Sequence, residues 1–274
     1  MGAVCNVCSR HCRIEEGGTG RCRARTCRDG EIVPLGYGRL TSMALDPIEK
    51  KPLKRFCPGS LILSVGSFGC NLCCPFCQNY EISAADVKSA ETRYVSSEEL
   101  ADTAERLAGQ GNIGVAYTYN EPLVGWEYVR DTAVLVHEKG MKNVLVSNGS
   151  AGIEIAAEIV PLMDAMNIDL KVFSEDGYKR LGGNLEQTEG FIKYAAGKTH
   201  LELTTLIVPG LNDDDGMMER EAAWIAGTDP EIPLHVTRYF PRWKMKEPAT
   251  PAETVYGLAD TARRYLRYVY TGNC

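Results

Sequence analysis

The spacing of hydrophobic residues changes along this chain near residue 60. Before that point apolar residues are sparse and show little periodicity, whereas after it short β-branched runs alternate with segments of helical spacing. Alternation of strands and helices predicts a parallel sheet with right-handed crossovers. The predicted strands span 61–65, 114–119, 143–149, 164–172, 201–209 and 235–240, with a short last strand at 268–272.

The predicted helices complete six strand–helix units that begin at residue 61. In the first helix, Ser96 and Glu99 have the spacing of a capping box, and Leu100, Ala104 and Leu107 share one face. No GxGxxG follows a strand, so the pattern favours a partial (β/α)6 TIM-like barrel over a dinucleotide-binding sheet. The helices are expected at 96–109, 126–140, 153–162, 174–197, 215–226 and 252–266.

Two regions follow from this change of pattern. Residues 1–59 are expected to form a small Cys-rich N-terminal metal-binding segment with a proline-containing connector, and residues 60–274 the α/β barrel. The first region is too poor in apolar residues to build a core alone, so we expect a metal to hold it together.

Length and charge exclude some classes of protein. A chain of 274 residues is long enough for one large α/β domain or two smaller ones. Its net charge of -6 makes nucleic acid an unlikely partner. No apolar run reaches the ~20 residues that cross a bilayer. The first residues lack the pattern of a signal peptide, so we expect a cytoplasmic protein without membrane contact.

The cysteines are the most unusual feature of the composition. There are 11 of them, and all but Cys274 lie within the first 77 residues. An odd number of cysteines in a chain without an export signal does not fit a disulfide framework. Clustered thiols in a reducing compartment usually bind metal.

Three of these cysteines have a spacing suited to an iron–sulfur cluster. Cys70, Cys74 and Cys77 form C-x3-C-x2-C directly after the first predicted strand. Three thiolates can ligate three corners of a cubane cluster and leave the fourth iron free for another ligand. Zinc with an open position and structural thiols are the two alternatives that the spacing leaves open.

Polar residues follow most of the predicted strands. In βα barrels the catalytic residues lie at the carboxyl ends of the strands, so these side chains are expected to point into one mouth. The residues are Cys70–Cys77, Asn120, Glu121, Ser147, Asn148, Asp169, Lys171 and His235.

The stretch CNLCCPFC (70–77) resembles the signature of the radical S-adenosylmethionine (SAM) superfamily. The resemblance implies that Cys70, Cys74 and Cys77 hold a [4Fe–4S] cluster whose open iron binds SAM, with Phe76 beside the adenine. In that family the reduced cluster cleaves SAM to methionine and a 5′-deoxyadenosyl radical, which abstracts hydrogen. Cys73 lies outside the spacing.

Four further motifs resemble those of pyruvate formate-lyase activating enzymes. They are TYNEP (118–122), SNG (147–149), DLK (169–171) and PLHV (233–236). The resemblance implies that Asn120, Glu121, Ser147, Asn148, Asp169, Lys171 and His235 contact SAM, with Lys171 at its carboxylate. Two positions depart from the pattern: Asn120 replaces a glycine, and Val146 replaces an aspartate.

Longer segments resemble the AmmeMemoRadiSam-system radical SAM proteins over nearly the whole chain. They include DPIEKKPL, NIDLKVF, PGLNDD and LHVTRYFP. The resemblance implies an oxidoreductase-type enzyme that binds SAM and receives electrons from a reductant such as flavodoxin or ferredoxin. It supplies no substrate, and both a glycine of a partner protein and a small molecule remain open.

The first cysteines form a second candidate site. Cys5, Cys8, Cys12 and Cys22 have the spacing C-x2-C-x3-C-x9-C, which suits a closed four-ligand site. A structural zinc and a second iron–sulfur centre are both open. Six arginines accompany these cysteines without aromatic residues between them. The alternative function is therefore a non-catalytic metal-bound scaffold, or a module that binds RNA or protein.

Overall fold

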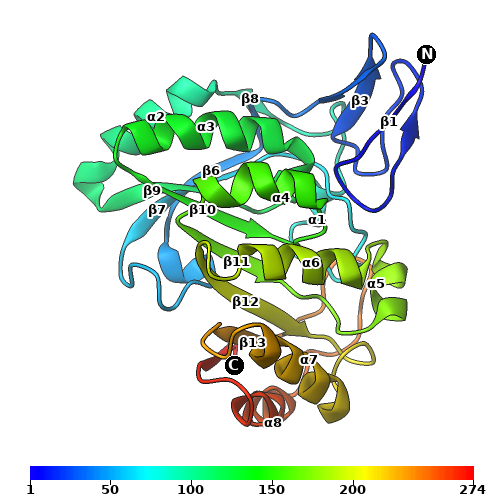
Figure 1. Cartoon of the computed structure of the whole chain (residues 1–274), viewed down its shortest axis with the longest axis vertical. Coiled ribbons are helices and arrows are strands. Elements are labelled where there is room, and N and C mark those ends of the chain that lie inside the picture. The colour runs from blue at the N-terminus through cyan, green and yellow to red at the C-terminus, as the bar shows by residue number, and fades with distance from the viewer.

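The computed structural model describes residues 1–274 and contains one eight-stranded sheet (Figure 1). Neighbouring strands from β7 to β14 run parallel, and β6 runs antiparallel to β7. The two edge strands β6 and β14 do not pair, which confirms a partial barrel. In sheet order the strands are β14 (Val269–Gly272), β13 (Leu234–Arg238), β12 (His200–Ile207), β11 (Ala165–Asp169), β10 (Lys142–Ser147), β9 (Asn112–Tyr117), β7 (Leu61–Gly66) and β6 (Ser42–Pro47).

The helices lie along one face of this sheet (Figure 1). Ser96 caps α2 by accepting from the backbone N–H of Glu99, as its spacing predicts. The helix predicted at 174–197 is two helices, because Gly182 has a φ of 80° and Asn184 caps a new helix. No helix is long and apolar enough to cross a membrane. The α-helices are α1 (Tyr80–Ser83), α2 (Ser97–Arg106), α3 (Trp126–Glu138), α4 (Ile153–Ile159), α5 (Glu175–Leu181), α6 (Leu185–Ala195), α7 (Asp215–Thr228) and α8 (Ala252–Arg263).

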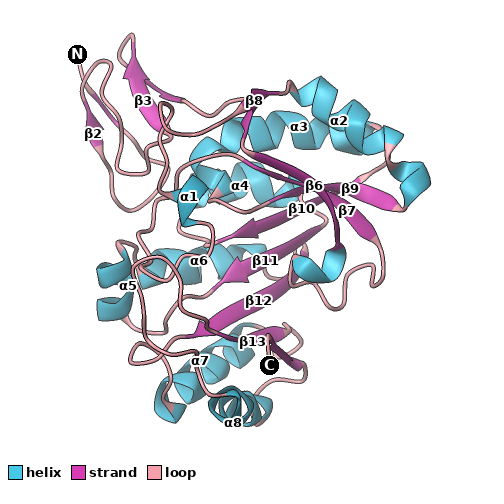
Figure 2. Cartoon of the chain, turned by 180° about the vertical axis from the view of Figure 1, so that it is seen from behind, coloured by secondary structure: helices cyan, strands magenta, loops and turns pink.

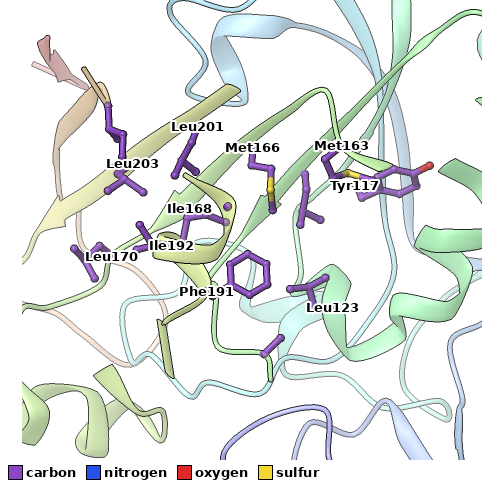
Figure 3. Packing of buried hydrophobic residues seen from close by; sticks show 14 of the residues in the cluster. Tyr117, Leu123, Met163, Met166, Ile168, Leu170, Phe191, Ile192, Leu201 and Leu203 are labelled. Carbon is purple, nitrogen blue, oxygen red and sulfur yellow. The ribbon is translucent and has the colours of Figure 1, made fainter. Parts of the chain in front are cut away.

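The two faces of the sheet differ in chemistry. The face toward the helices is apolar: Met166 and Ile168 of β11 pack with Phe191 of α6 (Figure 3). Side chains alternate along a strand, so the intervening residues lie on the opposite face, which we call the inner face. It includes the polar residues Ser64, Asn167, Thr204 and His235, and the apolar Ile62 and Val144 toward its base. The packed core therefore lies outside the barrel, and the inner face presents polar groups.

The connector, residues 48–60, closes the base of the barrel. Its Ile48 and Leu53 are fully buried against Ile62, Ala116 and Val144 of the inner face. The boundary predicted at residue 60 is therefore wrong in one respect, since β6 belongs to the sheet and the connector packs inside it. The sequence pattern missed this because an edge strand and a short loop carry little periodicity.

The N-terminal segment has little regular structure, as expected. Two short hairpins, together with the pairing of β5 with β8, account for its strands, and it lies beside the carboxyl ends of the barrel strands (Figure 2). The remaining short elements are β1 (Ala3–Val4), β2 (Arg13–Ile14), β3 (Arg25–Arg28), β4 (Glu31–Pro34), β5 (Arg39–Leu40), β8 (Arg93–Tyr94) and the 3-10 turns η1 (Ile48–Lys50), η2 (Ala108–Gln110), η3 (Pro122–Gly125) and η4 (Val160–Leu162).

One buried carboxyl makes the fold sensitive to pH. Glu221 of α7 is 1% exposed, accepts a hydrogen bond from the Thr205 hydroxyl, and has a pKa raised by burial to about 8. The folded protein therefore keeps this carboxyl protonated above pH 4.5, where the unfolded chain releases the proton. The free energy of unfolding must therefore fall as pH rises from 4.5 to about 8.

Replacing Glu221 with glutamine is expected to remove this pH dependence. At pH 7.5 we expect Glu221→Gln to raise the free energy of unfolding by about 2 kcal/mol, with little gain at pH 5. Urea unfolding at both pH values tests this, with the exposed Glu253→Gln as control. An equal effect at the two pH values would contradict the assignment.

Candidate functional site

The cysteine loop, residues 70–77, follows β7 directly and so lies at the carboxyl end of the first parallel strand. Gly69 precedes it with a φ of 84°, and a Cβ there would lie 2.4 Å from the carbonyl oxygen of Cys22. The N–H of Cys70 donates to that same carbonyl over 3.2 Å. Only glycine permits this approach, so the N-terminal segment helps to fix where the loop begins.

The loop brings the three predicted thiols near one another. Protein atoms desolvate the thiols of Cys70 and Cys74 although both residues are partly exposed. This raises the pKa of Cys74 to about 12 and that of Cys70 well above its usual value. The charges of neighbouring cysteines raise both pKa values further, and within the loop the N–H of Cys77 donates to the carbonyl of Cys74 at 3.2 Å. Such thiols form thiolates only when a cation binds them.

Three thiolates from one loop are a donor set of the kind that holds a cubane cluster. No three His, Cys, Asp or Glu side chains of the structure are arranged to hold one metal ion. A cubane binds each thiolate through a separate iron, so its ligands need not converge on one point. The fourth cysteine of the loop lies apart, because the exposed Cys73 directs its thiol to the Leu181 carbonyl at 3.2 Å.

Asn120 connects the loop after β9 to the cysteine loop. Its Oδ1 accepts from the N–H of Ser67 at 2.9 Å, and its Nδ2 donates to the carbonyls of Phe68 and Gly69. A glycine could make none of these contacts. Phe76 is 6% exposed and packs in the main core cluster.

Glu121 bonds to residues at the carboxyl end of β10, and its contact with SAM stays a prediction. It is 2% exposed, and its carboxylate accepts from the Ser147 hydroxyl and the Asn148 N–H, each at 2.8 Å. Burial raises the pKa of Glu121 to about 7. The Asn148 amide donates in turn to Asn71 Oδ1 at 2.9 Å and contacts Cys70 Sγ at 3.7 Å. These side chains therefore position the cysteine loop.

Lys171 and Asp169 lie on the other side of the thiols. Their side chains form an ion pair of 2.9 Å, and both are half-buried. Burial lowers the pKa of Lys171, but Asp169, Cys74 and Cys77 together raise it above its usual value. The Lys171 ammonium is therefore paired with one carboxylate, and the charges of Cys74 and Cys77 favour its protonated form.

His235 lies within β13, where it pairs with Thr204 of β12, and its contact with SAM stays a prediction. It is the second residue of β13, and its Nε2 contacts Glu202 at 2.6 Å deeper in the barrel. The motif predicts a histidine on a strand, and His235 lies on β13. How deep the side chain lies in the barrel depends on its position along that strand. The polar groups that sequence reasoning missed are Asn71 of the cysteine loop, Glu202, and the ion pair of Asp46 with Lys51.

The predicted N-terminal ligands also come together. Cys5, Cys8, Cys12 and Cys22 line one small apolar pocket together with Arg10 and Arg25. Both arginines have protein partners: Arg25 pairs with Glu127 at 2.6 Å, and Arg10 donates to the Asn71 carbonyl at 2.9 Å. These two guanidinium groups are therefore not free for RNA.

Comparison with known sequences identifies the family. Residues 64–222 match the model of the radical SAM superfamily. An uncharacterized protein from Methanocaldococcus jannaschii is 38% identical over 274 residues, which cover 98% of this chain and 80% of that protein. A GTP 3′,8-cyclase from Peptoclostridium acidaminophilum is 30% identical over 152 residues, which cover 53% of this chain and 46% of the cyclase.

Solved structures share the fold at low identity. A domain of pyruvate-formate lyase-activating enzyme from Bacteroides vulgatus gives a TM-score of 0.50 at 19% identity, covering 58% of this chain and 99% of that domain. SuiB from Streptococcus suis, bound to S-adenosylmethionine, gives a TM-score of 0.60 at 12% identity. The match covers 78% of this chain and 52% of SuiB. With the thiol loop at the end of the first parallel strand and the family match over more than half its length, this chain belongs to the radical SAM superfamily.

Proposed function

We propose that this protein is a radical SAM enzyme that abstracts hydrogen from a substrate with the help of a cluster held by Cys70, Cys74 and Cys77. The observation that carries the proposal is the position of this cysteine loop, which follows β7 at the carboxyl end of the sheet and lies within the region that matches the radical SAM model. When bound, a [4Fe–4S] cluster with SAM on its open iron supplies a 5′-deoxyadenosyl radical after one-electron reduction.

The chain's own residues hold and orient these groups. The thiolates of Cys70, Cys74 and Cys77 would hold the cluster, and the Lys171 ammonium, which pairs with Asp169 at 2.9 Å, would attract the carboxylate of SAM. Asn120, Glu121, Ser147 and Asn148 act through the loops that they fix, since their polar atoms bond mainly to protein. Phe76 packs beneath the loop and excludes water.

The inner face offers a place for the substrate. Above the apolar cluster at its base it carries Ser64, Asn167 and Thr204, whereas bulky branched side chains fill a closed TIM barrel. Lys51, Asp46 and Tyr119 lie toward its base, where Asp46 accepts from Lys51 at 2.9 Å and from Tyr119 at 2.6 Å. Strands β6 and β14 leave the barrel open between them. An open side favours an extended substrate such as a glycine-containing segment of a partner protein, as in an activating enzyme.

Anaerobic turnover tests the proposal directly. The protein is reconstituted with iron and sulfide, reduced with dithionite and given SAM, and 5′-deoxyadenosine is quantified by mass spectrometry. We expect a brown protein that releases 5′-deoxyadenosine only after reduction. A fully loaded protein that binds SAM but releases none, even with candidate peptides, would contradict the proposal.

Replacement of Lys171 is expected to weaken SAM binding. A hydrogen bond between charged groups contributes about 1.5–3 kcal/mol, so Lys171→Met should raise the Kd for SAM about tenfold to a hundredfold. Lys171→Met/Asp169→Asn avoids an unpaired carboxylate, and the exposed Lys179→Met is the control. Isothermal titration of the iron-loaded proteins measures the Kd. Unchanged affinity with unchanged iron content would refute this role.

A further inference from the structure

The segment that follows β13, residues 239–250, forms a strap whose two ends are bonded to each other and to the barrel. The N–H of Thr250 donates to the carbonyl of Tyr239 over 3.2 Å, and Arg238 Nε donates to the Thr250 carbonyl at 2.6 Å. The Thr250 hydroxyl donates in turn to the carbonyl of Ile207, the last residue of β12, at 2.6 Å. A loop whose ends meet in this way is an Ω-loop, a class that is frequently functional.

The tip of the strap contacts the cysteine loop and the helix that follows it. The N–H of Lys244 donates to the carbonyl of Pro75 in the cysteine loop over 3.1 Å. The ring of Trp243 stacks on Tyr80 of α1, with the ring centroids 5.6 Å apart and the planes 8° apart. Trp243 has a φ of 50°, a strained conformation for a bulky residue and one that clusters at functional sites. The strap therefore connects β13 with the segment that would hold the cluster.

The strap exposes three cations to solvent, namely Arg242, Lys244 and Lys246. None of the three forms an ion pair, and the one carboxylate of the strap, that of Glu247, accepts the backbone N–H of Lys246 at 3.0 Å instead. The positive charges of the strap are therefore free to interact with an anionic partner.

The aromatic rings of the strap, by contrast, already have partners within the chain. Trp243 stacks on Tyr80, and the ammonium of Lys244 lies 4.3 Å from the centroid of the Trp243 ring. Phe240 is 51% exposed, and the guanidinium of Arg238 lies 5.0 Å from the centroid of its ring. Single-stranded nucleic acid binds to loops of this composition by stacking its bases on open aromatic rings. The free cations and the occupied rings therefore favour carboxylates over bases as the ligand.

The N-terminal segment brings two further cations to the start of the cysteine loop. Arg21 and Arg23 are exposed, form no ion pair and flank Cys22, whose carbonyl accepts the N–H of Cys70 over 3.2 Å. The chain as a whole carries a net charge of -6, so unpaired cations on both segments that bond to the cysteine loop are a local exception. We call these five residues the basic rim: Arg21, Arg23, Arg242, Lys244 and Lys246.

We propose that the basic rim binds an acidic segment of a protein partner and so places that partner beside the cysteine loop. The inference deepens the proposed function and rests on it for the partner's role, because the partner is then the substrate that loses hydrogen. Complementary charges of this kind steer association and fix the orientation of the partner. The interaction should weaken with salt, since exposed charges more than about 8 Å apart are largely screened at about 0.15 M salt.

A peptide-binding assay tests the basic rim without any SAM chemistry. A fluorescently labelled peptide of alternating glutamate and glycine is titrated with the iron-loaded protein at low salt, and its anisotropy gives the Kd. Arg242→Glu/Lys246→Glu should raise this Kd about tenfold, because repulsion replaces attraction at two positions. Absence of peptide binding by the wild type would overturn the proposal.

The matched control reverses the same two residue types at the other end of the barrel. Arg106 and Lys198 are exposed and precede β9 and β12, so they lie at the amino ends of the strands. Arg106→Glu/Lys198→Glu changes the net charge equally and should leave the Kd unchanged. Equal weakening by the two double variants would show that only the net charge matters and would overturn the proposal.

Three further measurements separate the basic rim from its alternatives. Arg21→Glu/Arg23→Glu should also weaken peptide binding, and an unchanged Kd would overturn the assignment of both segments to one surface. A labelled single-stranded RNA should bind more weakly than the peptide, and tighter binding of the RNA would overturn the choice of an acidic protein. Reduction of the cluster by flavodoxin should keep its wild-type rate in Arg242→Glu/Lys246→Glu, since a slower rate would assign the rim to the electron carrier instead.

The binding assay fails independently of the proposed function. If 5′-deoxyadenosine forms but the wild type does not bind the acidic peptide, the basic rim is refuted and the radical chemistry stands. If the peptide binds and only Arg106→Glu/Lys198→Glu leaves the Kd unchanged, the basic rim is supported even when no 5′-deoxyadenosine forms.

Discussion

Replacement of Cys74 with alanine is expected to reduce 5′-deoxyadenosine formation to the background level, whereas replacement of the adjacent Cys73 should leave it intact. Cys74 lies near Cys77 and Lys171, and its desolvated thiol becomes a thiolate only on a cation. The Cys73 thiol is exposed and contacts the Leu181 carbonyl. The two substituted residues are adjacent in the sequence, but Cys74→Ala removes a predicted cluster ligand, whereas Cys73→Ala removes a contact with Leu181.

Three measurements separate loss of the cluster from loss of the fold. Iron and sulfide per chain should fall in Cys74→Ala and remain unchanged in Cys73→Ala. Thermal unfolding of the metal-free proteins should give similar transitions, because Cys73 is exposed and Cys74 is only partly buried at the border of the main core cluster. Equal 5′-deoxyadenosine yields from Cys74→Ala and the wild type would show that the C-x3-C-x2-C ligand assignment is wrong.

The fold could be predicted where local patterns are strong. The six central parallel strands are buried and rich in β-branched residues, so periodicity alone located them. Strand β6 was missed because its side chains are partly exposed and it ends at Pro47, features that lower the strand signal of an edge. The two glycines at 182 and 183 could have indicated the break between α5 and α6.

The site could be predicted only as far as spacing fixes geometry. The loop spacing groups Cys70, Cys74 and Cys77, and the two-residue offset brings Asp169 next to Lys171. The contacts of Glu121 could not be predicted, because its partners come from a loop 26 and 27 residues away. A different signal was available for Glu202, since a carboxylate within the apolar run LELTTLIV predicts buried polar partners.

Those partners make Glu202 the residue whose loss should destabilise the barrel most. It is fully buried and accepts from the backbone N–H groups of Lys54 and Arg55 and from the rings of His200 and His235, at 2.6–3.0 Å. Glu202→Ala leaves these donors without an acceptor, and we expect a loss of about 3–5 kcal/mol in the free energy of unfolding. Urea unfolding at pH 7 measures it, with the exposed Glu231→Ala as control.

The pH dependence of this loss distinguishes the carboxylate from simple packing. Burial would raise the pKa of Glu202, but its bonds with His200, His235 and the two connector N–H groups lower it to about 2. The stabilisation is therefore complete above the unfolded value of 4.5 and disappears as pH falls toward 2. The difference between the wild type and Glu202→Ala should accordingly shrink between pH 5 and pH 3. If the difference in the free energy of unfolding stays constant with pH, the packing of the Glu202 side chain, and not its charge, holds the connector against β12. The contacts at the base of the inner face would then be apolar rather than ionic.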